Sequence, residues 1–208
     1  MMKNYAHARS EECLPFLKGE FGVLAGLPFI DCWRLHRKLT VQIFEFGRPR
    51  YYDIGPKETP SASTENGLKG DARNGAHVAS QGPIALHVSC GWRLIKDTSI
   101  VVASGDHWHQ NDYIGEHKMP GKTQLDRSAE SLCEALKIQE IKVKDVSVTA
   151  LGDIAIAMTH GYTLELFPMS TESGEYWRLM YMDGRNYSLV CERDQIYTIE
   201  DELIPPPS

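Results

Sequence analysis

The sequence lacks the features that would place it in several large classes of protein. No run of apolar residues is long enough to span a bilayer, and the first residues reach Glu11 and Glu12 without the apolar stretch of a signal peptide. Basic residues are not in excess, since 28 acidic and 22 basic side chains give a formal charge of −6. A protein that binds a nucleic-acid duplex usually has a basic face. We therefore expect a cytoplasmic protein with no nucleic-acid and no membrane partner.

Cysteine is present, but its pattern fits no cross-linked framework. The five cysteines are odd in number, stand singly and form no Cys-x-x-Cys pair. We expect reduced thiols that pack as small apolar side chains in a reducing compartment. The residues concerned are Cys13, Cys32, Cys90, Cys133 and Cys191.

Motifs of nucleophilic, phosphate-binding and zinc-peptidase sites are also missing. The chain has no Gly-x-Ser-x-Gly and no His-Glu-x-x-His, and the glycines at Gly67 and Gly70 lack Walker spacing. We therefore predict no catalytic residues and no cofactor, apart from the metal site considered below. An enzyme is less expected than a binding protein.

Alternating apolar residues predict a protein dominated by strands. Ile84, Leu86 and Val88 begin an alternation that continues to Leu94 over eleven residues. His160-Gly161 and Asp183-Gly184 resemble tight hairpin turns. The fold class that this pattern predicts is α+β, mainly antiparallel sheet. The expected strands are 39–46, 84–94, 99–103, 154–158, 162–166, 177–181 and 187–191.

Two helical segments and one long loop complete this interpretation. Leu125, Leu132 and Leu136 lie on one helical face, so a helix is expected over 123–137. Pro15 allows only a short or broken helix over 10–19. The segment 48–82 is rich in Pro, Gly, Ser and Asn without an apolar period, which predicts a long surface loop, functional or disordered.

The two halves of the sequence contain similar strings, which suggests an internal duplication. Ala85–Val88 and Trp92–Leu94 correspond to Thr163–Leu166 and Trp177–Leu179. Ile100–Val102 and Ser188–Val190 would be the third matching pair. Two similar four-stranded meanders with a helix between them would explain this pattern.

The boundaries that follow are a first β-rich repeat over 1–122 and a helix plus a second repeat over 123–208. The loop at 48–82 is then an insertion in the first repeat. Both repeats could also form one compact domain, as one sheet or two. A further Trp33-Arg34-Leu35 lies outside this register, so chance recurrence of the tripeptide stays an alternative.

The arginines of these strings allow two interpretations. If Trp92 and Trp177 face a core, Arg93 and Arg178 point to the opposite face, because strand side chains alternate. They would then either bind an acidic partner or pair with cross-strand acids such as Glu165. We favour the pairing, because such cross-strand pairs are common.

One histidine-rich segment could bind a divalent metal. His107 and His109 would project to the same face of an extended chain, and Asp106, Asp112, Glu116 or His117 could complete the site. Imidazole and carboxylate groups are ligands that zinc accepts, but a solvated polar loop is the simpler explanation. The metal ligands we name are His107, His109, Asp112 and His117.

Two regions of the chain resemble a known group of proteins. Ile84–Leu94 (IALHVSCGWRL) resembles a signature of small bacterial proteins with β-rich domains of unknown function. Gly152–Ile154, Gly161–Pro168 and Glu175–Leu179 show the same resemblance. Some of these domains are similar to the immunity proteins of bacterial toxin systems. The resemblance implies a bacterial origin and a binding role, and it supplies no catalytic residues.

The leading hypothesis is a non-enzymatic, immunity-like protein-interaction module with a protein partner. Its binding residues would be Trp108, His107, His109 and Asp112, with Trp108 as the anchor, because tryptophan is enriched in binding hot spots. A metal-dependent hydrolase centred on 106–117 is the alternative. A small-ligand binder with a cleft between the repeats is a third possibility.

Overall fold

The computed structural model describes the backbone of most of the chain, and the statements below concern that part. It comprises residues 3–8, 11–34, 41–53, 70–73, 76–107, 124–170, 174–185, 187–193 and 195–200.

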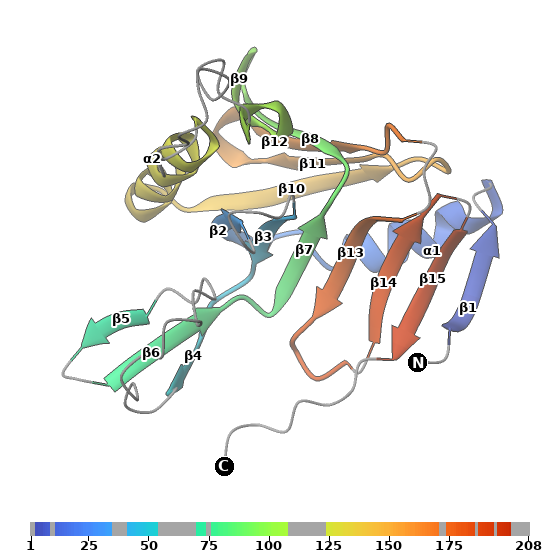
Figure 1. Ribbon diagram of the computed structural model, residues 1–208, viewed down its shortest axis with the longest axis horizontal. Coiled ribbons are helices and arrows are strands. Elements are labelled where there is room, and N and C mark those ends of the chain that lie inside the picture. Colours follow the sequence, from blue (N-terminus) through green and yellow to red (C-terminus); the bar gives the residue numbers. More distant parts are fainter. Residues whose placement is uncertain are drawn as a thin grey trace, which may run out of the picture.

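Helices and strands follow one another in a similar order in the two halves of the chain (Figure 1). The first half contains β1 (Lys3–Ala8), η1 (Glu11–Cys13), α1 (Leu14–Gly22), β2 (Pro28–Arg34), β3 (Gln42–Phe46), β4 (Arg50–Asp53), β5 (Gly70–Arg73), β6 (Ala76–Gln81), β7 (Ile84–Val88), β8 (Gly91–Lys96), β9 (Ser99–Ala103) and η2 (Ser104–His107). The second half contains α2 (Gln124–Ile138), β10 (Ile141–Val148), β11 (Ile154–Met158), η3 (Thr159–Gly161), β12 (Tyr162–Phe167), β13 (Glu175–Tyr181), β14 (Tyr187–Glu192) and β15 (Gln195–Glu200).

Twelve of the described strands form one antiparallel sheet, which confirms the mainly antiparallel α+β class. Their order is β1-β15-β14-β13-β7-β3-β2-β10-β11-β12-β8-β9. The junction between β2 and β10 is short, with the pairs Ile141–Phe29 and Lys142–Pro28. Figure 1 shows the consequence: β8 to β12 lie across one part of the molecule, and β13 to β15 turn away from them.

The eleven-residue alternation at 84–94 is two strands joined by a corner. β7 ends at Val88, and the backbone N–H groups of Ser89 and Cys90 both donate to the carbonyl of Tyr176, at 2.8 and 3.1 Å. β8 then starts at Gly91. Because the alternation continues through the corner, both strands present apolar residues to the core, and the sequence pattern hides the break.

The corner sends each strand to a partner from the other half of the chain. β7 pairs with β13, where Val88 lies opposite Trp177, and β8 pairs with β12, where Trp92 lies opposite Leu166. β12 and β13 are therefore separated in the sheet, as are β7 and β8. The two separate four-stranded meanders expected from the sequence are not formed, because groups of two or three neighbouring strands from one half lie between groups from the other half.

The first two strands that follow the helix in each half pair with an irregularity at the same place. The β2–β3 ladder is irregular between Phe29 and Asp31, and the β10–β11 ladder is irregular between Val143 and Asp145. The helices are exchanged in the same way as the strands, since α1 packs on β10 and α2 packs on β2.

Two buried tryptophans occupy corresponding places in the core. Trp92 contacts Phe44 edge-on at a centroid distance of 5.1 Å, and Trp177 contacts Phe21 edge-on at 5.3 Å. Both are 1% exposed or less. The Trp177 indole donates to the carbonyl of Gly152 at 2.8 Å. The indole N–H of Trp92 has no acceptor among the described residues.

Both predicted helices are present, and the first differs in length. Pro15 lies in the first turn of α1, where its missing N–H costs no hydrogen bond, so the helix continues to Gly22. α2 covers Gln124–Ile138, as the periodicity predicts, with Leu132 buried on its inner face. No helix within the described ranges is long and apolar enough to cross a membrane.

The segment 48–82, expected to be a loop, contains three strands. β4, β5 and β6 pair in the order β4-β6-β5 and project from the main sheet (Figure 1); we call them the β-arm. The arm prolongs the β3–β7 hairpin, because the pair Phe46–Ile84 is followed by the pair Arg50–Gln81. Strands of four to six residues are too short for an apolar period to identify them in a polar segment.

Candidate functional site

The predicted histidine-rich site lies mostly outside the described residues. Described are Asp106, whose carboxylate accepts a hydrogen bond from the backbone N–H of Ala103 at 2.9 Å, and the backbone of His107, where η2 ends. The carboxylate of Asp106 therefore supports the turn after β9. The other predicted residues, and the His107 side chain, lie outside the described part: Trp108, His109, Asp112, Glu116 and His117.

No group of three or more His, Cys, Asp or Glu side chains in the described ranges is arranged to hold a metal ion. The metal site at 106–117 therefore stays a prediction. None of the five cysteines forms a disulfide bond. The Cys133 thiol donates to the carboxylate of Asp31 at 3.0 Å, and this contact joins α2 to β2.

A pocket of about 560 Å³ lies at the base of the β-arm. Both halves of the chain contribute to it, through the α1–β2 and α2–β10 connections and the two ends of the arm. Its size is typical of ligand pockets. Its walls are formed by Gly26, Leu27, Pro28, Gly47, Arg48, Pro49, Arg50, Pro83, Glu140 and Lys142.

Backbone hydrogen bonds fix the walls of this pocket. The N–H of Gly47 donates to Pro28 O at 2.8 Å, the N–H of Gly26 to Val143 O at 2.9 Å, and the N–H of Val143 to Leu27 O at 2.9 Å. These bonds tie the root of the arm and the start of β10 to one connection.

The root of the arm is tightly packed at Gly47. This residue has φ +94°, a left-handed conformation that favours glycine. A Cβ at this position would collide with the Cγ of Pro83, in the connection between β6 and β7. At Gly82 a Cβ would lie 2.8 Å from the carbonyl of Phe46. The buried carboxylate of Glu45 accepts the N–H of Gly82 at 3.1 Å.

The pocket has an excess of positive charge. Arg48 is exposed and has no hydrogen-bond or ion-pair partner within the described ranges. Arg50 donates to the carbonyl of Met182 at 3.3 Å, a contact that leaves its charge uncompensated. Lys142 pairs with Glu140 at 2.8 Å. Three cationic side chains and one carboxylate thus line this pocket in a chain with a net charge of −6.

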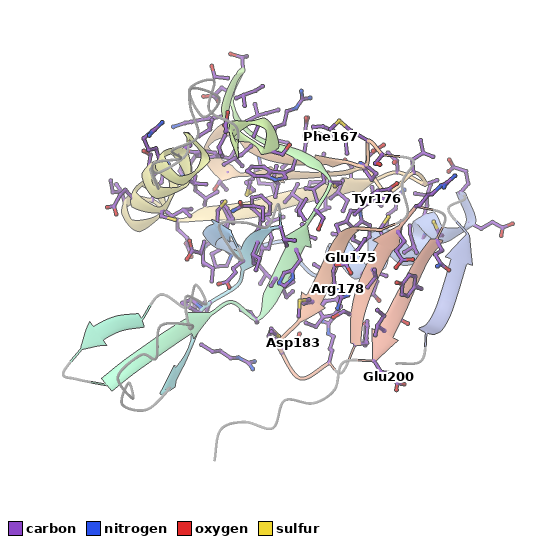
Figure 2. All side chains as sticks on the ribbon, viewed as in Figure 1. Phe167, Glu175, Tyr176, Arg178, Asp183 and Glu200 are labelled. Carbon is purple, nitrogen blue, oxygen red and sulfur yellow. The ribbon has the colours of Figure 1, made fainter. Side chains whose placement is uncertain are left out.

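Both strand arginines pair with carboxylates, but only Arg93 forms the cross-strand pair favoured from the sequence. Arg93 forms a cross-strand pair with Glu165 at 2.5 Å. Arg178 lies opposite His87 instead and pairs with Glu175 on its own strand at 2.6 Å. An irregularity of β13 after Glu175 brings the two side chains together, and Figure 2 labels both residues on this strand.

A partly buried polar cluster surrounds Arg178. Burial lowers the pKa of His87, and the charge of Arg178 acts in the same direction, while Glu175 opposes it. Glu192 lies directly opposite Glu175 and accepts a hydrogen bond from the Tyr197 hydroxyl at 2.5 Å. Burial and this bond raise the pKa of Tyr197. The bonds within the cluster offset the repulsion between the two carboxylates and point to a structural role.

A second polar cluster ties α1 to the β13–β14 hairpin. The Tyr181 hydroxyl donates to the carboxylate of Glu20 at 2.6 Å, and Tyr187 donates to the same carboxylate at 3.2 Å. Burial, then the bond to Glu20, raises the pKa of Tyr181. The Arg185 guanidinium lies 4.4 Å from the centre of the Tyr181 ring. These groups satisfy one another and fix the helix against the sheet.

Sequence reasoning missed the basic residues of the pocket. Arg48 and Arg50 lie in the segment assigned to a loop, and Lys142 lies on a strand that no pattern had identified. The available signal was the string Gly47-Arg48-Pro49-Arg50, in which two cations stand next to a glycine and a proline that interrupt the strand.

No protein family, curated protein or solved structure matched the chain.

Proposed function

We propose that the chain is a protein-interaction module that binds its partner through the β-arm and the pocket at its base. The observation that supports this function is that the arm interrupts one half of an otherwise matching arrangement. The bacterial immunity-like role implied by the sequence resemblance is compatible with it.

We infer that the two halves are repeats that exchange strands. Strands β2, β3, β7, β8 and β9 correspond in sheet position to β10, β11, β12, β13 and β14, read from the two sides of the β2–β10 junction. Arg93 opposite Glu165 corresponds to Arg178 opposite His87 in the same register. This correspondence supports a duplication and replaces the meander arrangement expected from the sequence.

The two repeats differ in the connection that joins their second and third strands. In the second half, β11 and β12 are joined by a tight turn in which His160 and Gly161 both have positive φ. In the first half, β3 and β7 are joined by residues 47–83, which contain the arm. The fold of the second half needs no arm. An insertion that the fold does not require is a natural place for function.

The strand arrangement of the arm favours a binding partner. Its three short strands pair only with one another in the described part of the chain. Small sheets of this kind need a packed face to be stable in water. The outer edges of β4 and β5 have no strand partner among the described residues, and an exposed edge can pair with a strand of another protein.

Replacing the arm tests the proposal. One variant joins β3 to β7 through Thr-His-Gly in place of 47–83, copying the turn at Thr159–Gly161. A milder variant joins Arg50 to Gln81 by Asn-Gly, which removes the outer arm and keeps the pocket. Far-UV circular dichroism and thermal melting establish which variants fold.

Affinity purification from the source cells with the intact chain identifies a partner, which is then purified and titrated by calorimetry. We expect the intact chain to bind with defined stoichiometry and the folded arm variants to lose at least tenfold in affinity, equivalent to about 1.4 kcal/mol. Undiminished binding by a folded arm variant would overturn the proposal. The Trp108→Ala variant tests the anchor predicted from the sequence in the same assay.

A further inference from the structure

The pocket at the base of the arm has a charge that selects its ligand. This inference rests on the proposed function and goes further by naming the chemistry of the partner. Arg48 and Arg50 both line the pocket from the root of the arm, and neither has a carboxylate partner in the described part of the chain. Lys142, at the start of β10, also lines the pocket and is only locally neutralised by Glu140.

We propose that the pocket binds carboxylate side chains of an extended acidic segment of the partner protein. The guanidinium group of arginine matches a carboxylate with two parallel hydrogen bonds. Arg48 and Arg50 lie one residue apart on either side of Pro49, and both are exposed. The pair can therefore receive acidic side chains without first breaking an ion pair.

The strand arrangement indicates why the ligand is a peptide segment. β4 begins at Arg50, in the wall of the pocket, and it is an edge strand of the arm. A partner segment that adds to β4 by backbone pairing is led toward the pocket. Backbone hydrogen bonds then supply affinity along β4, and the cations select acidic side chains.

The remaining charge of the protein strengthens this selection. With a net charge of −6, most of the surface repels an acidic segment, and the cations at the arm base attract it locally. At physiological ionic strength, salt screens the attraction between exposed charges that are more than about 8 Å apart. Binding of an acidic segment is therefore expected to weaken as salt is raised.

A titration of the intact chain with hexaglutamate peptide tests the inference. Gly26 and Gly47 line the pocket, and their amide signals can be followed in 1H–15N spectra. We expect both to shift with saturation, and hexalysine to leave them unchanged. The Arg48→Gln/Arg50→Gln variant is expected to bind hexaglutamate about threefold to tenfold more weakly, from two exposed ion pairs. Lys144→Gln, two residues from Lys142 on the same strand and outside the pocket, serves as the matched control.

Three results would overturn the inference: absence of shifts at Gly26 and Gly47, equal binding by the Arg48→Gln/Arg50→Gln and Lys144→Gln variants, or stronger binding of inorganic phosphate at the same amides. The last result would assign the pocket to a small anion. Each is distinguishable from failure of the proposed function. A partner that is lost with the arm but binds the Arg48→Gln/Arg50→Gln variant fully would leave the module standing and remove only the acidic ligand.

Discussion

Replacing Trp177 with phenylalanine is expected to destabilise the protein more than the same change at Trp92. Both indoles are almost fully buried and both contact a phenylalanine ring edge-on. They differ in one hydrogen bond, because the Trp177 indole donates to Gly152 O at 2.8 Å. The Trp92 indole has no acceptor in the described part of the chain.

The magnitude follows from this difference. Both changes remove a similar volume from the core, so the loss of apolar burial and the cavity cost largely cancel in the comparison. Trp177→Phe also breaks a buried bond and leaves the carbonyl of Gly152 unsatisfied, which costs about 1–3 kcal/mol. Trp92→Phe removes an unsatisfied donor and has no such cost. We expect the free energy of unfolding to differ by about 1–3 kcal/mol between the variants.

Urea unfolding followed by far-UV circular dichroism measures this difference. In a chain of this size, 1 kcal/mol corresponds to about 2–4 °C in melting temperature, so a thermal melt gives an independent value. Equal losses at Trp92 and Trp177, or a larger loss at Trp92, would refute the assignment of the hydrogen bond.

Two further predictions concern the arm root and the polar cluster. Gly47→Ala and Gly26→Ala both place an alanine at positive φ, at a cost of about 1–2 kcal/mol. Only Gly47→Ala also brings a Cβ against Pro83, so we expect it to lower the free energy of unfolding more than Gly26→Ala in urea titrations. Equal effects would contradict the close packing at the root. Burial lowers the folded-state pKa of His87 below its ordinary 6.5, so its contribution to stability is complete above about pH 6.5 and is lost as pH falls toward the lower value. The urea midpoint should therefore drop between pH 7.5 and 5.5, and His87→Gln should reduce that slope; an unchanged slope would count against the burial of His87.

Much of the fold could be predicted from local patterns. The alternation in 154–158 and 162–166 and the turn at His160-Gly161 predict the β11–β12 hairpin correctly, because such turns require positive φ and a half-buried strand requires period two. The helix over 123–137 is confirmed for the same reason, since one face of α2 is apolar and covers β2.

The pairing of strands could not be predicted in this way. Apolar alternation continues from Val88 to Trp92 across the corner, so nothing in the pattern separates β7 from β8. Which strands lie side by side depends on contacts between residues far apart in the chain, such as Arg93 with Glu165. The similar strings at Trp92 and Trp177 indicated a correspondence, but they carried no information about the exchange of partners.

The candidate site was missed for a different reason. The arm strands are short and polar, and their neighbours Gly47 and Pro83 read as loop residues, although close packing is what requires them there. The pocket also combines residues more than 90 positions apart, such as Arg48 and Lys142, which no local spacing relates. The histidine-rich segment was predicted as a site because its residues are adjacent in the sequence.

Hydrogen–deuterium exchange of the intact chain with its purified partner is the most direct test of the proposed interaction. The account predicts slower exchange on binding in three backbone segments that meet at the arm and its base: 47–53, 76–83 and 26–28. Exchange over β8, β9 and β12, on the other part of the sheet, is expected to stay unchanged. Protection confined to β8, β9 and β12, with the arm exchanging as in the free protein, would contradict the proposal that the arm and its pocket bind the partner.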